Sequence, residues 1–270
     1  MISNQILIMR RIQSGVFGLD ELLYGGFVKN TVNALIGTTG CGKTIFSIQY
    51  LLEGLEAGER GVYVSIDLTE EEFIRIAESM GWDLEKYVKS GQLKIGQFYV
   101  KDASFLDSDL IKFVRGRDLR IVIDSFSPLI ASADYSSRSS VGFFFKTLRE
   151  YGTAVVTLEE PFIGEPSALS NISLFLADSV IQLKNVGVGE LYSRTLRVVK
   201  HRMSRHADGV YPYRIIEGVG IVIEERRGEG FKPELGDLDL PDFAKKELSE
   251  LAEKGCITPE DIEKIKRRVV

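Results

Sequence analysis

One short stretch constrains this chain of 270 residues more than any other part of it. Residues Gly37, Thr38, Thr39, Gly40, Cys41, Gly42, Lys43 and Thr44 match G-x-x-x-x-G-K-[ST] at every fixed position. In such a phosphate loop the glycines let successive backbone N–H groups wrap around an anion. The lysine reaches the β- and γ-phosphates, and the last hydroxyl binds Mg²⁺. We therefore expect all eight residues to bind ATP, with Lys43 also catalytic and Thr44 also a ligand of Mg²⁺.

The residues around this loop fit the same interpretation. A β-branched run at 32–36 precedes it, and apolar residues recur with helical spacing over 44–57 after it. Strand, loop and helix in this order are the context that the motif requires. Cys41, inside the loop, allows two interpretations: a redox-sensitive thiol activated by the helix end, or a position that needs a small side chain. We favour the small side chain.

A nucleotide site of this kind also needs a carboxylate at the end of a neighbouring strand to hold Mg²⁺. The apolar run at 120–123 ends in Asp124, which we predict to be that metal ligand; the alternative is an aspartate in an ordinary turn. Glu159, at the end of a later strand, is a candidate sensor of the γ-phosphate or simply a surface acid.

Alternating strand and helix patterns predict the fold class. The expected strands are 32–36, 62–66, 120–123, 154–158, 179–183 and 195–200, and the expected helices between the first four are 44–57, 70–80, 108–116 and 140–151. This order predicts an α/β fold with a mainly parallel sheet between helices. Hairpin-like strands with turns at 187–189 and 218–220 follow residue 178, so we expect antiparallel strands to extend the sheet.

Two domains are expected, residues 1–230 and a small helical appendage at 231–270. An acidic stretch at 234–242 has the composition of a linker, and a helix over 242–254 follows it. Thr258, Pro259 and Asp261 then supply an N-cap, a proline at N1 and an acid at N3, which indicate the start of a second helix.

Composition excludes some classes of protein. Lys and Arg number 34 against 39 Asp and Glu, a net charge of −5, which argues against a protein that coats nucleic acid. No apolar run is long enough for a membrane span, and residues 6–9 are too short for the core of a signal peptide. Cys41 and Cys256 form no pairing or metal pattern, as in reducing compartments. A cytoplasmic protein is therefore expected.

Several further motifs resemble KaiC-type ATPases of the RecA/RadA superfamily. They are the glycine-rich segment 15–26 ahead of the phosphate loop, Gly81-Trp82-Asp83-Leu84, and the closing segments 194–206 and 211–213. The resemblance covers about residues 10–225 and implies a RecA-like, ATP-binding core that assembles as a homo-oligomeric ring, usually a hexamer, with nucleotide between subunits. It further implies that a Lys-x-Arg pair from one subunit contacts the phosphates held by the next.

Lys200 and Arg202 fit that pair, so we assign them catalytic and nucleotide-binding roles in trans. The period of two along a strand puts both on one face, with His201 on the other. The alternative is an exposed basic strand surface.

The chain departs from the family at the end of its second strand. KaiC-type ATPases carry two adjacent glutamates there, and the first polarises the attacking water; this chain has Asp67 and Leu68. Asp67 is one methylene shorter than glutamate, and Leu68 cannot accept a hydrogen bond, so we expect slow hydrolysis. Glu70, Glu71 and Glu72 could substitute, but Thr69 and Glu72 fit a capping box at a helix start.

Three functions remain open at this point. The first is a slow, Mg²⁺-dependent, ring-forming ATPase that acts as a switch or signalling protein. The second is a RadA-like ATPase of recombination or repair; the loops 131–139 and 161–171 that would face a ring's pore carry one base, which disfavours DNA. The third is a nucleotide-gated scaffold with little hydrolysis that binds protein partners through the C-terminal hairpin.

Overall fold

The computed structural model describes residues 9–99, 109–128, 138–160, 168–185, 194–236 and 238–269. Its strands are β1 (Arg11–Ile12), β2 (Phe27–Val28), β3 (Val32–Gly37), β4 (Arg60–Ser65), β5 (Leu93–Gln97), β6 (Leu119–Asp124), β7 (Gly152–Glu159), β8 (Ser179–Asn185), β9 (Arg194–His201), β10 (Tyr211–Ile216) and β11 (Gly220–Ile223). Its helices are α1 (Leu19–Leu22), α2 (Lys43–Glu56), α3 (Glu70–Ser79), α4 (Glu85–Lys89), α5 (Asp109–Phe113), α7 (Arg138–Tyr151), α8 (Ala168–Leu176), α9 (Asp242–Glu253) and α10 (Pro259–Arg268).

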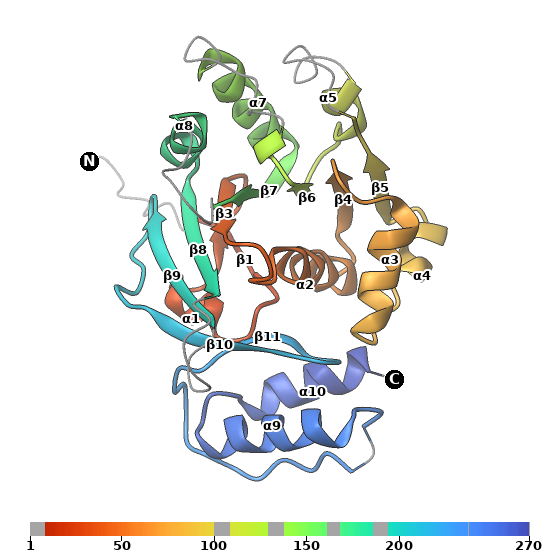
Figure 1. Ribbon diagram of the computed structural model, residues 1–270, viewed down its shortest axis with the longest axis vertical. Coiled ribbons are helices and arrows are strands. Elements are labelled where there is room, and N and C mark those ends of the chain that lie inside the picture. Colours follow the sequence, from red (N-terminus) through yellow and green to blue (C-terminus); the bar gives the residue numbers. More distant parts are fainter. Residues whose placement is uncertain are drawn as a thin grey trace, which may run out of the picture.

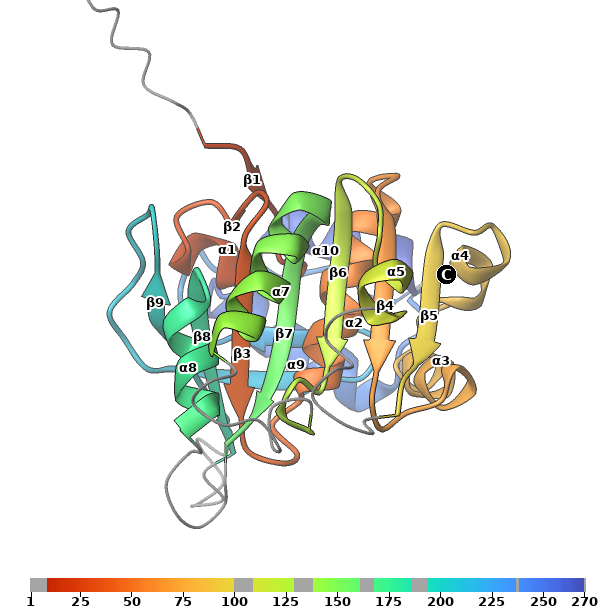
Figure 2. The same cartoon turned by 90° about the horizontal axis from the view of Figure 1, so that it is seen from above.

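A nine-stranded sheet organises the molecule, in the order β11-β10-β9-β8-β3-β7-β6-β4-β5. The strands from β8 to β5 pair in parallel, whereas β9, β10 and β11 extend the sheet by antiparallel pairing. Figure 2 shows the parallel strands with their carboxyl ends at one edge of the sheet. The predicted α/β class, with antiparallel strands at the end of the sheet, is confirmed.

Successive side chains of the buried strands point to opposite faces of the sheet, and each face has its own apolar core. In β6, Val122 faces the core that contains α2, whereas Ile121 and Ile123 face the core that contains α7. Figure 1 shows the layers: α2 and α3 cover one face, and α5, α7 and α8 cover the other. Parallel strands buried on both faces need near-continuous apolar sequences, which explains why these strands were recognisable.

Helix starts follow the predicted local signals. Thr69 and Glu72 form a capping box at α3, and Thr258 and Asp261 form another at α10. The three acids in the first turn of α3 therefore stabilise the positive end of that helix.

Some elements were not predicted. The edge strand β5 and the helix α8 were both missed, and α5 is shorter than the predicted 108–116. The apolar run of α8 lies partly in the segment 161–171 that we expected to be a loop. The expected turn at 187–189 and most of the loop 131–139 fall outside the described residues.

The appendage is a helical hairpin, α9 and α10, packed beneath β10 and β11 (Figure 1). The stretch expected to be a linker does not run free, because Leu235, Leu238 and Leu240 are buried. They share one apolar cluster with Phe17 and Val222 of the main sheet layer. The boundary at residue 230 stays a prediction.

None of the helices in the described part of the chain combines the length and apolar content needed to cross a bilayer.

Candidate nucleotide site

The phosphate loop joins the carboxyl end of β3 to the first turn of α2. Gly40 and Gly42 have positive φ angles of 76° and 94°, which side chains rarely adopt. A Cβ atom on Gly42 would lie 2.6 Å from Cδ1 of Ile215. The glycines of the motif are therefore required both for the conformation of the loop and for its close packing.

A cavity of about 440 Å³ opens beside the loop. Its walls include Lys43 and Thr44 of α2, and the carboxylates that end three parallel strands or follow them directly: Asp67, Asp124 and Glu159. The sheet thus brings together residues that lie more than a hundred positions apart, at the edge where the parallel strands end.

Lys43 folds back onto its own loop. Its Nζ donates to the carbonyl oxygens of Gly37, at 2.8 Å, and Thr38, at 3.2 Å. These two contacts hold the ammonium group at the loop, from which it can turn to a phosphate oxygen.

Asp124 is buried and is held by three hydroxyl groups. Its Oδ1 accepts from Thr157 Oγ1 at 2.6 Å, and its Oδ2 accepts from Tyr63 at 2.9 Å and Thr44 at 3.1 Å. The carboxylate of Asp124 and the hydroxyl of Thr44 are the hard oxygen donors that Mg²⁺ prefers. Within the described residues no group of three or more His, Cys, Asp or Glu side chains could hold a metal. Mg²⁺ takes one or two protein ligands beside phosphates and water. The residues therefore fit a Mg²⁺ ion bound together with nucleotide phosphates.

Comparison with known proteins identifies the family. The sequence model of the KaiC family of ATPases matches residues 12–228. The chain belongs to the KaiC ATPase family. It is 33% identical over 233 residues to the circadian clock oscillator protein KaiC of Synechococcus elongatus, covering 78% of this chain and 44% of that protein. It is 31% identical over 237 residues to the circadian clock protein KaiC2 of Synechocystis sp., covering 82% of this chain and 41% of that protein. The chain thus spans less than half the length of these KaiC relatives.

The departure from the KaiC pattern lies in the wall of the cavity. Asp67 and Leu68 both line it, and Asp67 is exposed. The backbone N–H of Leu68 donates to Ser65 Oγ at 2.7 Å, which fixes the turn that carries both residues. The side chain of Leu68 brings an apolar group to a position where the family pattern has a carboxylate.

Lys200 and Arg202 do not line the cavity of their own chain. Lys200 Nζ donates to the carbonyl oxygens of Leu174, Phe175 and Ala177, and Arg202 donates to that of Phe175. Both therefore point to the same side, at the carboxyl end of α8, whereas His201 contacts Ser179. Partial burial, and then the charge of Arg202, lower the pKa of Lys200 to about 8.

Cys41 is fully buried, and burial raises the pKa of its thiol. A buried thiol with a raised pKa is a poor nucleophile, which supports a small, packed side chain over a redox-sensitive one.

Two residues of the site were missed at the sequence level. Tyr63 lies inside β4 and Thr157 inside β7, and both hydroxyls hold Asp124. The only signal was a polar side chain within a strand that is otherwise apolar, and this does not reveal which residue it contacts.

Proposed function

We propose that this chain is a Mg²⁺-dependent ATP-binding protein and a slow ATPase that acts as a nucleotide-dependent switch. The arrangement of Lys43, Thr44 and Asp124 around one cavity supports the ATP and Mg²⁺ sites. Lys43 and the loop N–H groups hold the phosphates, while Thr44 and Asp124 hold the ion, which neutralises charge developing on the phosphoryl group. Asp67 orients the attacking water, less effectively than a glutamate.

We further propose that nucleotide lies between copies of the chain in a ring. Lys200 and Arg202 do not line the cavity of their own chain, and they carry the positive charge that a phosphate site needs from outside. Beside them Phe175, Val199 and Met203 are exposed at 67%, 47% and 54%, an apolar surface of the kind that subunit interfaces cover.

Hydrolysis and assembly can be tested separately. Release of phosphate from Mg-ATP should be slow, and it should be abolished by Lys43→Ala; a brisk rate would contradict the slow ATPase. The mass in solution should increase when Mg-ATP is added. A monomer under both conditions would overturn the trans role of Lys200 and Arg202, and leave ATP binding untouched.

The recombination ATPase remains the second candidate, although no described feature favours it. Binding of single-stranded DNA measured across salt concentrations distinguishes the two, because contacts to DNA phosphates must weaken as salt rises.

A further inference from the structure

A second cavity, of about 420 Å³, lies at the seam between α2, the segment 82–87 and α10. It shares no lining residue with the cavity at the phosphate loop. One of its walls, α10, lies beyond residues 12–228 that match the family. The site therefore combines residues of the part that matches the family with residues of the hairpin, which lies outside that match.

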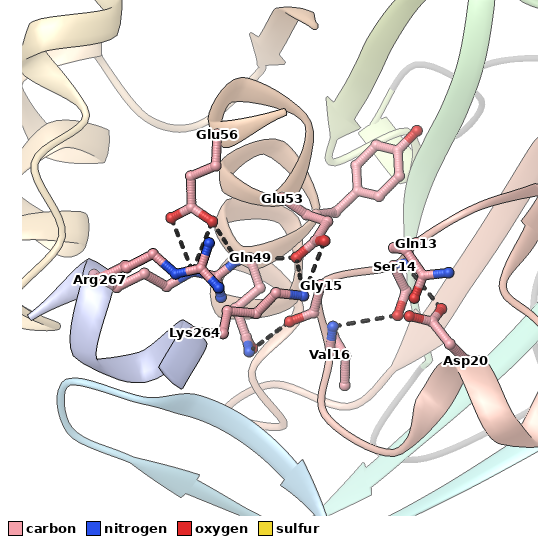
Figure 3. Close-up of polar contacts among 12 residues, drawn as sticks. Gln13, Ser14, Gly15, Val16, Asp20, Gln49, Glu53, Glu56, Lys264 and Arg267 are labelled. Carbon is pink, nitrogen blue, oxygen red and sulfur yellow. Dashed lines mark hydrogen bonds and ion pairs between the residues drawn. The ribbon is translucent and has the colours of Figure 1, made fainter. Parts of the chain in front are cut away.

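Ion pairs fix α10 at this seam. Arg268 donates to Glu53 and Glu56 at 2.9 to 3.1 Å, and Lys264 pairs with Glu53 at 2.7 Å. Figure 3 shows Lys264 of α10 facing Glu53 of α2. Burial opposes ionisation of Glu53, but Lys264 and Arg268 together leave its pKa below the ordinary value. Glu53 and Glu56 are thus already paired with cations.

Two buried N–H groups in the walls have no acceptor within the described part of the chain. Trp82 is 1% exposed and Arg268 is 8% exposed. Trp82 Nε1 and one terminal nitrogen of Arg268 have no hydrogen-bond partner among the described residues. Both side chains line the same cavity. Buried donors of this kind are nearly always paired in native proteins, so a small shift of either side chain toward the cavity would let its N–H donate to an occupant.

The charge of the walls indicates what that occupant is. Four cations and three carboxylates line the cavity, a surplus of one positive charge. Lys86 and Arg267 are exposed at its rim and pair with no carboxylate in the described part of the chain. Leu52 and Ala57 add an apolar surface.

We propose that this seam binds a small oxyanion, the phosphate or carboxylate group of a metabolite. Its oxygens accept hydrogen bonds from Trp82 and Arg268, and Lys86 and Arg267 attract it electrostatically. A volume of about 420 Å³ suits a small metabolite. Because α2 and α10 both contribute, the bound ligand fastens the hairpin to the helix that starts at the phosphate loop.

Trp82 is the only tryptophan of the chain, so its fluorescence reports on this site directly. We would titrate the full chain carrying Lys43→Ala, which weakens phosphate binding at the loop, with inorganic phosphate and, separately, with citrate. A saturable change in fluorescence is expected with at least one of them, and the responding anion distinguishes a phosphate from a carboxylate ligand.

A matched pair of double variants tests the site. Lys86→Gln with Arg267→Gln should raise Kd by about tenfold or more, because both rim charges are lost. Lys89→Gln with Lys232→Gln removes the same charge outside the cavity and should leave Kd unchanged. Absence of a saturable change, or equal weakening by both doubles, would overturn the proposal.

Trp82→Phe keeps the ring packing and removes the N–H donor. The increase in melting temperature caused by the responding anion should then be lost in a variant that still unfolds cooperatively. An undiminished increase would show that Trp82 does not donate to the ligand.

Discussion

At the scale of single residues, the hydroxyl of Tyr63 fixes the orientation of the Asp124 carboxylate by donating to its Oδ2. Its ring is stacked on Phe73 with centroids 3.6 Å apart, so the hydroxyl is held firmly at Oδ2 of Asp124. Burial, and then the nearby charge of Asp124, raise the pKa of Tyr63 well above its ordinary value, so it stays a donor at physiological pH.

Tyr63→Phe should therefore weaken the Mg²⁺-dependent part of ATP binding. A hydrogen bond to a charged group contributes about 1.5–3 kcal/mol, so the ratio of affinities with Mg²⁺ and with EDTA should fall by roughly tenfold or more. Calorimetric titration measures this ratio. Tyr50→Phe is the matched control, because it also loses a buried tyrosine hydrogen bond, of 2.7 Å to Thr153, away from Asp124. An unchanged ratio in Tyr63→Phe would show that the hydroxyl is only structural.

Asp67→Glu should speed hydrolysis. The extra methylene extends the carboxylate toward the water that attacks the γ-phosphate, and a positioned general base contributes factors of about 10²–10⁴. Timed phosphate release should show an increase of about tenfold, with nucleotide affinity unchanged. A rate equal to that of the parent chain would place the cause of slowness elsewhere, with Leu68 the next position to change.

These residues also show what the sequence could and could not predict. The phosphate loop was predicted because its residues are consecutive, and Asp124 because it ends an apolar strand. Tyr63 and Thr157 were missed because their contact with Asp124 depends on the order of strands in the sheet, which no local pattern reveals. Likewise two carbonyl partners of Lys200, those of Leu174 and Phe175, belong to α8, a helix whose first residues we took for part of a loop.

At the scale of elements, the start of α10 controls how firmly the hairpin is closed. Thr258 Oγ1 accepts from the N–H of Asp261 at 3.2 Å, and Asp261 also pairs with Arg227. Cap and ion pair together tie the hairpin turn to the strand layer.

Thr258→Ala should lower the free energy of unfolding by about 1 kcal/mol, the usual cost of a lost N-cap. Thr258→Ser keeps the hydroxyl and should lose little. Urea unfolding measures both. A full loss in the serine variant would mean that the methyl group, not the cap, stabilises this end of the helix.

At the scale of the whole molecule, two buried groups give opposite pH dependences. Burial raises the pKa of Asp20 to about 7, against hydrogen bonds from Ser14. Burial and then Arg11 lower the pKa of His201 to about 4. Between pH 4 and 7 the folded chain holds a proton on Asp20 that the unfolded chain releases, so this group makes stability fall as pH rises. His201 has the reverse effect between pH 4 and 6.5, because the unfolded chain binds the extra proton.

Asp20→Asn removes the first of these effects and keeps an oxygen that can accept from the Ser14 N–H, a contact of 2.9 Å. Relative to the parent chain, the stability of the variant should therefore rise with pH between about 4 and 7. The negative charges of Glu53 and Glu21 also raise the pKa of Asp20, so these residues are left unchanged. Denaturant unfolding across this pH range provides the measurement. Parallel stability curves for the two proteins would contradict a raised pKa at Asp20.

The place of β3 in the sheet has a consequence for synthesis of the chain. The strand that leads into the phosphate loop has hydrogen-bonded neighbours only in β7 and β8, with Val32 opposite Ala154 and Asn33 opposite Ser179. A ribosome must therefore translate about as far as Asn185 before β3 can be flanked on both sides. Such distant pairings form slowly, and the apolar strands made in the meantime are exposed to aggregation. In an emerging chain, the strand that leads into the phosphate loop thus stays without one of its two neighbours until residue 185 has been made.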